Sequence, residues 1–133
     1  MSRQKSILLI DEDEMVRQAL GNALESEEYS VVFAANRQEA LLRLGSQPVG
    51  LVLLDLNPRN EDGWETLHRL RSIQPGLQVI ALTARSEQHD PTSRANGIEA
   101  LLEKPLNLSD LFETLEWLSS QLLKPAGPRV QLP

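Results

Sequence analysis

The chain has 133 residues, 41% of them hydrophobic, which suits one globular domain with a buried core. Its 13 basic and 19 acidic residues give a formal charge of −6 at pH 7, so a general nucleic-acid-binding surface is not expected. The chain has no cysteine and 2 histidines, which excludes a disulfide framework and a thiolate or histidine-based metal site. Its apolar runs are too short to cross a bilayer, so we expect a cytoplasmic protein without membrane contact.

Apolar runs of strand length alternate with segments of helical period along the chain, and this alternation predicts a doubly wound parallel sheet built from five βα units. The strands are expected at residues 6–10, 29–34, 51–54, 77–82 and 100–102. The helices are expected from 14 to 26, from Asn36 through 44, from 63 to the Gln74-Pro75-Gly76 turn, from Pro91 to about 97, and from Asn107 to 122. The third strand is apolar at every position, which is typical of a strand buried on both faces.

Four of the predicted helices carry a stripe of apolar residues at helical spacing, and these stripes are expected to face the sheet. The inward residues are expected to be Val16, Ala19, Leu20, Ala23 and Leu24 in the first helix, Ala40, Leu41 and Leu44 in the second, Trp64, Leu67 and Leu70 in the third, and Leu111, Phe112, Leu115, Leu118 and Leu122 in the last. The expected N-caps are Asn36, with Glu39 reaching back to it, Asp90 and Asn107.

Doubly wound sheets bind ligands beyond the carboxyl ends of their strands, so the polar residues at those ends are candidates for one shared site. They are Asp11, Glu12 and Asp13 after the first strand, Asp55 and Asn57 after the third, Thr83 after the fourth and Lys104 after the fifth. Converging carboxylates repel one another unless a cation lies between them, and Mg²⁺ prefers such oxygen ligands. A lysine and a hydroxyl are suited to phosphate, so the set predicts phosphoryl transfer with a carboxylate as acceptor.

Each candidate also has a simpler structural interpretation. Acids that follow a strand often cap the next helix and complement its dipole, and Asp13 and Glu14 are assigned that role. A threonine such as Thr83 commonly serves as a strand former, and a lysine such as Lys104 as a solvated loop residue. Candidates at the ends of four of the five strands favour a shared site for the others.

The residues at these positions match a known family, and from residue 6 to about 122 the chain resembles the receiver domain of two-component response regulators. The matching motifs are, in chain order, the acidic pair Asp11-Glu12 with Arg17, the acceptor Asp55 with Asp62-Gly63 seven and eight residues on, Thr83-Ala84, and Lys104-Pro105. Each motif alone is weak. The ordered set, with the strands and helices between its members, is specific.

The resemblance implies a flavodoxin-like (βα)5 fold, a three-layer α/β/α sandwich. It also implies that Asp55 accepts a phosphoryl group, with Lys104 paired to the phosphoryl oxygens and the Thr83 hydroxyl moving to meet them. Such a domain is no enzyme in the ordinary sense, because it assists only its own phosphorylation and dephosphorylation. The ligands implied for Mg²⁺ (or Mn²⁺) are the side chains of Asp11, Glu12 and Asp55 and the backbone carbonyl of Asn57.

The chain departs from the family pattern at three places. Pro58-Arg59 replaces the usual Met-Pro, which moves the proline next to Asn57 and restricts its backbone. Leu101 stands at the switch position, where the family usually has Tyr or Phe, so an aromatic ring cannot couple phosphorylation to the surface. Glu12 replaces the commoner second aspartate and lengthens that ligand arm by one methylene. The positions expected to tune switching or the phosphate lifetime are Asn57, Ala84, Arg85 and Leu101.

Two alternatives stay open at this point. The Asp11-x-Asp13 pattern after an apolar strand is similar to the first motif of haloacid-dehalogenase-like phosphatases, in which Asp11 would be the nucleophile and Asp13 the general acid. That family needs a further acidic pair after the lysine, whereas only Asp110 lies near, and Asp55 would have no role. The second alternative is a receiver-like interaction module that signals without phosphorylation.

The expected organisation is a receiver domain at residues 1–123 followed by a Pro/Gly-containing tail or linker start at 124–133. The resemblance implies a sensor histidine kinase or a histidine phosphotransfer protein as one partner and a downstream protein target as another, with no direct nucleic-acid binding. A homodimer is an alternative to a monomer, and a piece of a longer regulator or hybrid kinase is an alternative to a stand-alone protein.

Overall fold

The computed structural model describes residues 6–56, 62–84 and 97–122, with side chains up to residue 120. Within these ranges its strands are β1 (Ser6–Ile10), β2 (Ser30–Ala34), β3 (Leu51–Asp55), β4 (Gln78–Thr83) and β5 (Ala100–Glu103). Its helices there are α1 (Glu14–Ser26), α2 (Arg37–Ser46), α3 (Gly63–Ile73) and α5 (Leu108–Leu122). None of these helices is long and apolar enough to span a membrane.

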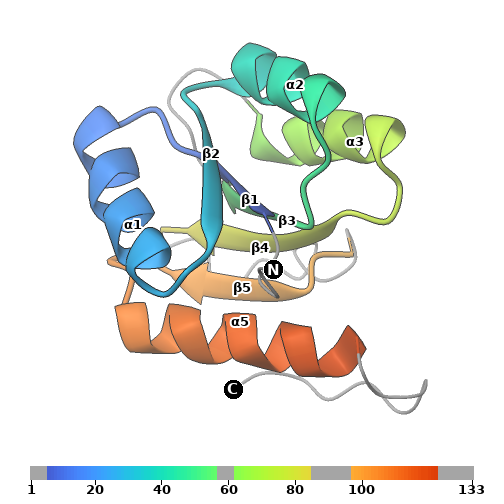
Figure 1. Ribbon diagram of the computed structural model, residues 1–133. Coiled ribbons are helices and arrows are strands. Elements are labelled where there is room, and N and C mark those ends of the chain that lie inside the picture. Colours follow the sequence, from blue (N-terminus) through green and yellow to red (C-terminus); the bar gives the residue numbers. More distant parts are fainter. Residues whose placement is uncertain (1–5, 57–61, 85–96, 123–133) are drawn as a thin grey trace.

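All five strands run parallel in the order β2-β1-β3-β4-β5 (Figure 1). This order reverses direction at β1 and is that of the flavodoxin-like doubly wound sheet. The predicted fold class is therefore confirmed. The predictions that lie outside the described residues are the helix at 91–97 with its cap Asp90, the positions Asn57, Pro58-Arg59 and Arg85, the tail at 124–133, and the side chain of Leu122.

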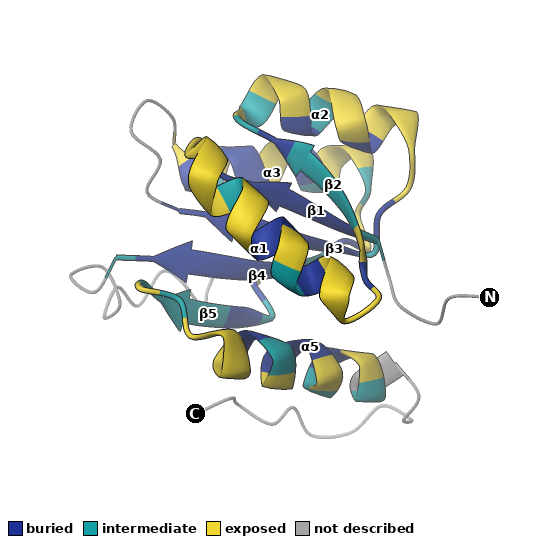
Figure 2. Cartoon of the chain, turned by 60° about the vertical axis from the view of Figure 1, so that its left-hand side comes forward, coloured by how far each residue is buried: buried dark blue, intermediate teal, exposed yellow. Residues whose placement is uncertain are grey.

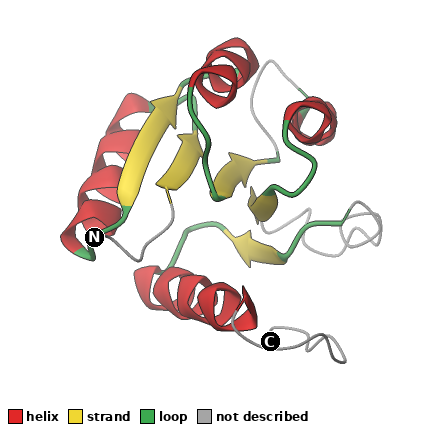
Figure 3. Ribbon diagram, turned by 45° about the vertical axis from the view of Figure 1, so that its right-hand side comes forward, coloured by secondary structure: helices red, strands yellow, loops and turns green. Residues whose placement is uncertain are grey.

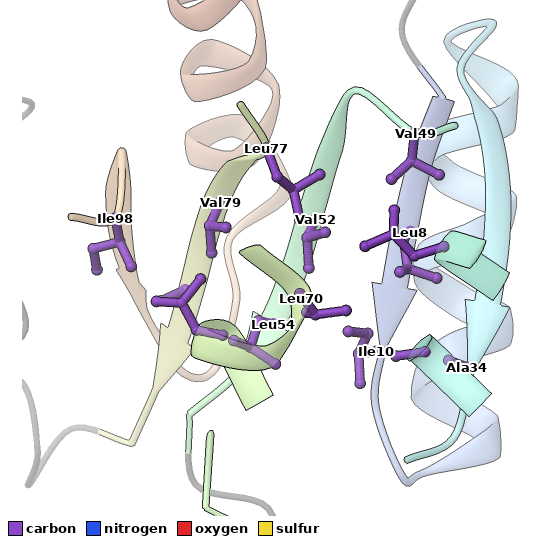
Figure 4. Packing of buried hydrophobic residues seen from close by; sticks show 14 of the residues in the cluster. Leu8, Ile10, Ala34, Val49, Val52, Leu54, Leu70, Leu77, Val79 and Ile98 are labelled. Carbon is purple, nitrogen blue, oxygen red and sulfur yellow. The ribbon is translucent and has the colours of Figure 1, made fainter. Parts of the chain in front are cut away.

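Helices cover both faces of the sheet, with α2 and α3 on one side and α1 and α5 on the other (Figures 1 and 3). The alternation of side chains along β3 shows why this strand is apolar throughout. Val52 and Leu54 pack toward α2 and α3, whereas Leu51 and Leu53 pack toward α1 and α5. Figure 4 shows the first cluster from close by, with Val52 among residues from the neighbouring strands.

The buried face of α1 differs from the predicted stripe. Leu20 and Leu24 are buried as expected, but Val16 is 38% exposed and Ala19 is exposed as well. Gly21 is buried on this face of the helix instead, and it packs so closely that a Cβ there would lie 2.4 Å from the ring of Phe33. The helix thus approaches β2 through a glycine, and a search for apolar residues at helical spacing overlooks such a contact. Figure 2 shows the exposed outer side of α1 in front of the buried strands.

The predicted helix caps are largely confirmed. The Asp13 carboxylate accepts from Met15 N at 2.9 Å and from Val16 N at 3.2 Å, so it caps α1. Asn36 caps α2 by accepting from Glu39 N at 2.9 Å. The Glu39 side chain bonds to Ala35 rather than to the expected Asn36, because its Oε1 accepts from Ala35 N at 2.7 Å.

The remaining caps and turns lie at the ends of α5 and α1. At the start of α5, Asn107 Oδ1 accepts from Asp110 N at 3.2 Å, which confirms the last cap. At the other end of α1, Glu28 has a φ of 71°, in the left-handed region that favours glycine.

Candidate functional site

An ion pair between Asp55 and Lys104 forms the centre of the candidate site. Asp55 is the last residue of β3 and is 6% exposed, because the strand is covered on both faces. Lys104 follows β5, and its Nζ donates to Asp55 Oδ2 at 2.9 Å. The lysine backbone is held in place by a hydrogen bond from its N–H to the carbonyl of Thr83, at 2.8 Å. The register of three neighbouring strands therefore sets the geometry of the pair.

Asp11 contributes a second buried carboxylate to the same end of the sheet and is 5% exposed. Its Oδ1 accepts from Asp13 N at 2.9 Å, and its backbone N–H donates to Ala34 O at 3.1 Å. Burial raises the pKa of Asp11, and the nearby charges of Asp55 and Asp13 raise it further, while the bond from Asp13 N and the charge of Lys104 oppose the increase. A negative charge on this group is therefore costly in the protein alone.

Arg17 helps to position this carboxylate. Its Nη1 donates to the backbone carbonyl of Asp11 at 2.7 Å, across one turn of α1 and the capping residues. The resemblance to the receiver family pointed to this arginine only through its position after the Asp11-Glu12 pair. The structure assigns it a role in fixing the loop that carries the acidic pair.

The residues present suit a hard divalent cation. Asp11, Glu12 and Asp55 line one hollow together with Asn36 and Thr66. Mg²⁺ commonly takes only one or two carboxylates from a protein and completes its shell with carbonyls and water, and a cation would offset the cost of the buried charge on Asp11. Among residues 6–56, 62–84 and 97–122 no three acidic or histidine side chains lie close enough to form a metal cage by themselves.

The other predicted site residues that the structure describes differ in their exposure. Thr83 is 1% exposed at the end of β4, and its Oγ1 donates to Ala84 O at 3.4 Å, a long bond. Glu12 is exposed, whereas Ala84 is half-buried. Leu101 is also half-buried and packs against the cluster under α2 and α3. Asn57 and Arg85 lie outside the described residues.

The Asp62-Gly63 motif has a clear structural reason. Asp62 caps α3, with its Oδ1 accepting from Trp64 N at 2.9 Å. A Cβ on Gly63 would lie 2.5 Å from the Cα and O of Leu56, the residue that follows Asp55. Only a glycine lets α3 begin so close to the residue that follows β3, which gives a structural reason for the glycine of this motif.

Two residues near the site were missed in the sequence. Thr66 is 2% exposed and lines the hollow, although it lies within α3 rather than at a strand end. Arg37, the first residue of α2, donates from Nε to Thr66 Oγ1 at 3.0 Å and from Nη2 to Asp62 O at 3.2 Å. The only signal for Arg37 in the sequence was weak: this long, positively charged residue directly follows Asn36, a predicted helix cap.

Comparison with known proteins agrees with this arrangement. A family model described as "Response regulator receiver domain" matches residues 7–116. The transcriptional regulatory protein GlrR of Escherichia coli is 34% identical over 111 residues, which cover 83% of this chain and 25% of GlrR. The response regulator receiver protein CpdR of Brucella abortus is 34% identical over 113 residues, which cover 84% of this chain and 94% of CpdR.

Solved structures show the same fold. A CheY-like response regulator receiver domain protein from Methanospirillum hungatei has a TM-score of 0.80 at 28% identity and covers 89% of this chain, with 95% of that chain matched. The response regulator TrrA from Thermotoga maritima, in complex with Mg²⁺ and BeF, has a TM-score of 0.75 at 28% identity, with 86% and 99% of the two chains matched.

Proposed function

The chain belongs to the response regulator receiver domain family, and from this membership we propose that Asp55 is the residue that accepts the phosphoryl group. Receiver domains are phosphoryl-accepting signalling domains of two-component systems. The observation that carries the assignment to Asp55 is its ion pair with Lys104, because this buried carboxylate has a cation fixed 2.9 Å away at the open end of the sheet.

In the proposed reaction a carboxylate oxygen of Asp55 attacks the phosphorus of a phosphohistidine on the donor protein. The P–N bond breaks, the imidazole leaves with its electron pair and takes up a proton, and Asp55 becomes an acyl phosphate. Water later attacks the phosphorus, the bond to the Asp55 oxygen breaks, and inorganic phosphate leaves. Lys104 balances the charge of the phosphoryl oxygens in both steps, and the domain thereby assists its own phosphorylation and dephosphorylation.

The proposed metal ligands are the side chains of Asp11, Glu12 and Asp55 with the carbonyl of Asn57. Bound Mg²⁺ or Mn²⁺ would neutralise charge that develops on the phosphoryl oxygens. Asp11 presents its carboxylate in a fixed orientation, because Asp13 N holds one of its oxygens and Arg17 holds its carbonyl. Glu12 lines the same hollow with its longer side chain.

We propose that phosphorylation is transmitted by Thr83 and β5. The buried Thr83 hydroxyl donates to the adjacent Ala84 carbonyl at 3.4 Å, and a charged phosphoryl oxygen would be a stronger acceptor than that carbonyl. Leu101 lies within β5 and packs against the core, and its aliphatic side chain implies a switching movement without a rotating aromatic ring. Arg85, Ala84 and Asn57 are proposed to tune the phosphate lifetime.

Partners are proposed from the family in the same way. A sensor histidine kinase or a histidine phosphotransfer protein would supply the phosphoryl group, and a downstream protein would read the phosphorylated surface. The chain spans about a quarter to a half of the length of the GlrR and MprA relatives, so their whole-protein activities do not transfer directly. We propose a cytoplasmic domain that does not itself bind nucleic acid, acts as a monomer or homodimer, and comprises residues 1–123, with 124–133 as tail or linker.

The phosphatase alternative finds little support, because Asp13 is occupied as the cap of α1 and is exposed. The interaction module would have the same site residues but would signal by protein binding, without phosphorylation of Asp55.

Labelling tests the proposal. The protein is incubated with Mg²⁺ and acetyl phosphate, and the labile label is located by mass spectrometry. We expect label on Asp55 and none on an Asp55→Asn variant. Label on Asp11 would instead indicate the phosphatase. An absence of label from acetyl phosphate and from the cognate kinase would favour the interaction module.

A further inference from the structure

We propose that the Glu99 carboxylate sets the register of β5 against β4, and that it thereby positions Lys104 beside Asp55. This inference rests on the proposed function of the Asp55 site and names a further residue on which that site depends. Glu99 directly precedes β5, whereas Lys104 directly follows it. Glu99 is therefore a positioning residue that acts through the strand, not a group that contacts the phosphoryl oxygens.

The sequence of β5 does little by itself to fix the position of this strand along β4. The strand has 4 residues and lies at the edge of the described sheet (Figure 1). Residues 100–102 are all apolar, so a shift by one residue would still bury an apolar side chain on each face. Such a shift would move Lys104 by about 3.3 Å and turn its side chain to the other face, which would break its 2.9 Å contact with Asp55.

Glu99 supplies a contact that exists in one register only. Ile80 lies opposite Ala100 in the ladder, so Val79 lies opposite Glu99, one position before the start of β5. Glu99 N donates to Val79 O at 2.9 Å, and Val79 N donates in return to Glu99 Oε1 at 2.7 Å. The carboxylate thus takes the place of a strand carbonyl, and a shifted strand would lose both bonds.

A cation from α3 holds this carboxylate in place. Arg71, in the last turn of α3, donates from Nη2 to Glu99 Oε1 at 3.2 Å. Its Nε and Nη2 also donate to the carbonyl of Leu77, which precedes β4, at 3.3 and 3.0 Å. Ile98 packs into the core cluster with Leu77 and Val79 (Figure 4), which holds the backbone before Glu99. The amino end of β5 is therefore tied to both α3 and β4.

An alternative explanation is that the Arg71–Glu99 pair only stabilises the fold, and the two explanations predict different results. If the pair only stabilises the fold, its loss changes the fraction of unfolded protein, and folded protein keeps its full labelling rate. If Glu99 positions Lys104, its loss slows the labelling of Asp55 in protein that is fully folded. The effect should then disappear when Lys104 is absent, because Glu99 acts through that lysine.

The test measures the rate at which acetyl phosphate labels Asp55 at saturating Mg²⁺, under conditions in which circular dichroism shows each variant to be folded. We expect Glu99→Ala to slow labelling by about tenfold, because a small misplacement of a catalytic group can cost up to about 10²-fold. Glu99→Gln keeps an oxygen that can accept from Val79 N, and its rate should lie within about twofold of the parent.

Glu65→Ala is the matched control for the loss of a charge and of an ion pair. Glu65 also pairs with an arginine of α3, since Arg69 Nη2 lies 2.8 Å from Glu65 Oε2, but this i,i+4 pair is exposed. Its labelling rate should stay within about twofold of the parent, as expected for an exposed pair. Arg71→Ala is a second variant of the proposed contact. It removes the support from α3 but keeps the Glu99 carboxylate, so labelling should slow less than in Glu99→Ala.

Two further measurements separate positioning from a general loss of stability. In a Lys104→Ala background, Glu99→Ala should cause no further loss of labelling rate. Nuclear Overhauser effects between Ala81 and Leu101, which lie opposite each other in the ladder, report the register directly. They should weaken in Glu99→Ala and persist in Glu65→Ala, while those between β1 and β3 stay unchanged in both.

The outcomes that overturn the inference are distinct from those that overturn the proposed function. A parent-like labelling rate in folded Glu99→Ala, a Glu99→Gln as slow as Glu99→Ala, or a full further loss in the Lys104→Ala background would overturn the positioning role. Labelling of Asp55 in the parent would still stand in each case. A parent that takes no label on Asp55 would overturn the proposed function, and the Overhauser effects would still show whether Glu99 sets the register.

Discussion

Replacement of Gly63 by alanine tests whether α3 approaches the Leu56 backbone, at the end of β3, as closely as the structure indicates. The added Cβ would lie 2.5 Å from two backbone atoms of Leu56, whereas ordinary contacts begin at 3.4 Å. Because backbone cannot rotate away as a side chain can, either Leu56 or the helix start must move. Overpacking of this kind costs about 1–3 kcal/mol, and the better helix propensity of alanine offsets up to about 1 kcal/mol of it.

We therefore expect Gly63→Ala to lower the free energy of unfolding by about 1–2 kcal/mol, which corresponds to a fall in Tm of about 4–8 °C. Gly45→Ala is the matched control, since Gly45 is also helical and a Cβ there has nothing within 4 Å. That control should be neutral or more stable by up to about 1 kcal/mol. Urea and thermal unfolding followed by circular dichroism measure both variants. Equal stability of the two would refute the close contact.

Three further predictions concern charge and backbone strain. A raised pKa means that protonated Asp11 stabilises the fold below its ordinary value of 3.8 and that this stabilisation is lost as pH rises through the folded pKa. Without metal, Asp11→Asn should therefore unfold at a higher urea concentration than the parent at pH 7. The difference between their urea midpoints should shrink as the pH is lowered, and a difference that does not change with pH would contradict the burial argument. Glu28→Gly should raise Tm by about 4 °C, since it relieves about 1 kcal/mol of left-handed strain, and an unchanged Tm would argue against that conformation. Lys104→Ala should slow acetyl phosphate labelling by about 10²-fold, with unaltered labelling as the contrary result.

The sequence predicted the strands and the shared site for one physical reason. A strand buried on both faces must be apolar along its length, and parallel strands bring their carboxyl ends to one edge. Asp55 and Lys104 could thus be assigned to the same site before their 2.9 Å contact was seen. Strand limits were less well predicted. Tyr29 and Leu77 are buried, but their N–H groups bond back to Leu24 and Gln74 rather than to a neighbouring strand.

Contacts that depend on side-chain reach or on a missing side chain could not be predicted. Gly21 is buried against Phe33, but a glycine does not count as apolar in a search for helical periodicity. The predicted inward face of α1 therefore included Val16, which is exposed, and omitted Gly21. Arg37 reads as a solvated first-turn residue, because nothing in its spacing reveals an acceptor on another helix. Thr66 was overlooked for a similar reason, since its burial comes from the packing of α2 against α3.

The ion pair at the centre of the site joins residues that are 49 positions apart in the chain. Its lysine follows the last strand of the sheet, and the neighbouring acid of Asp11 follows the first. During synthesis on the ribosome, Asp55 therefore emerges well before Lys104. The proposed acceptor carboxylate gains its neighbouring cation only after β5 has been made and has paired with β4.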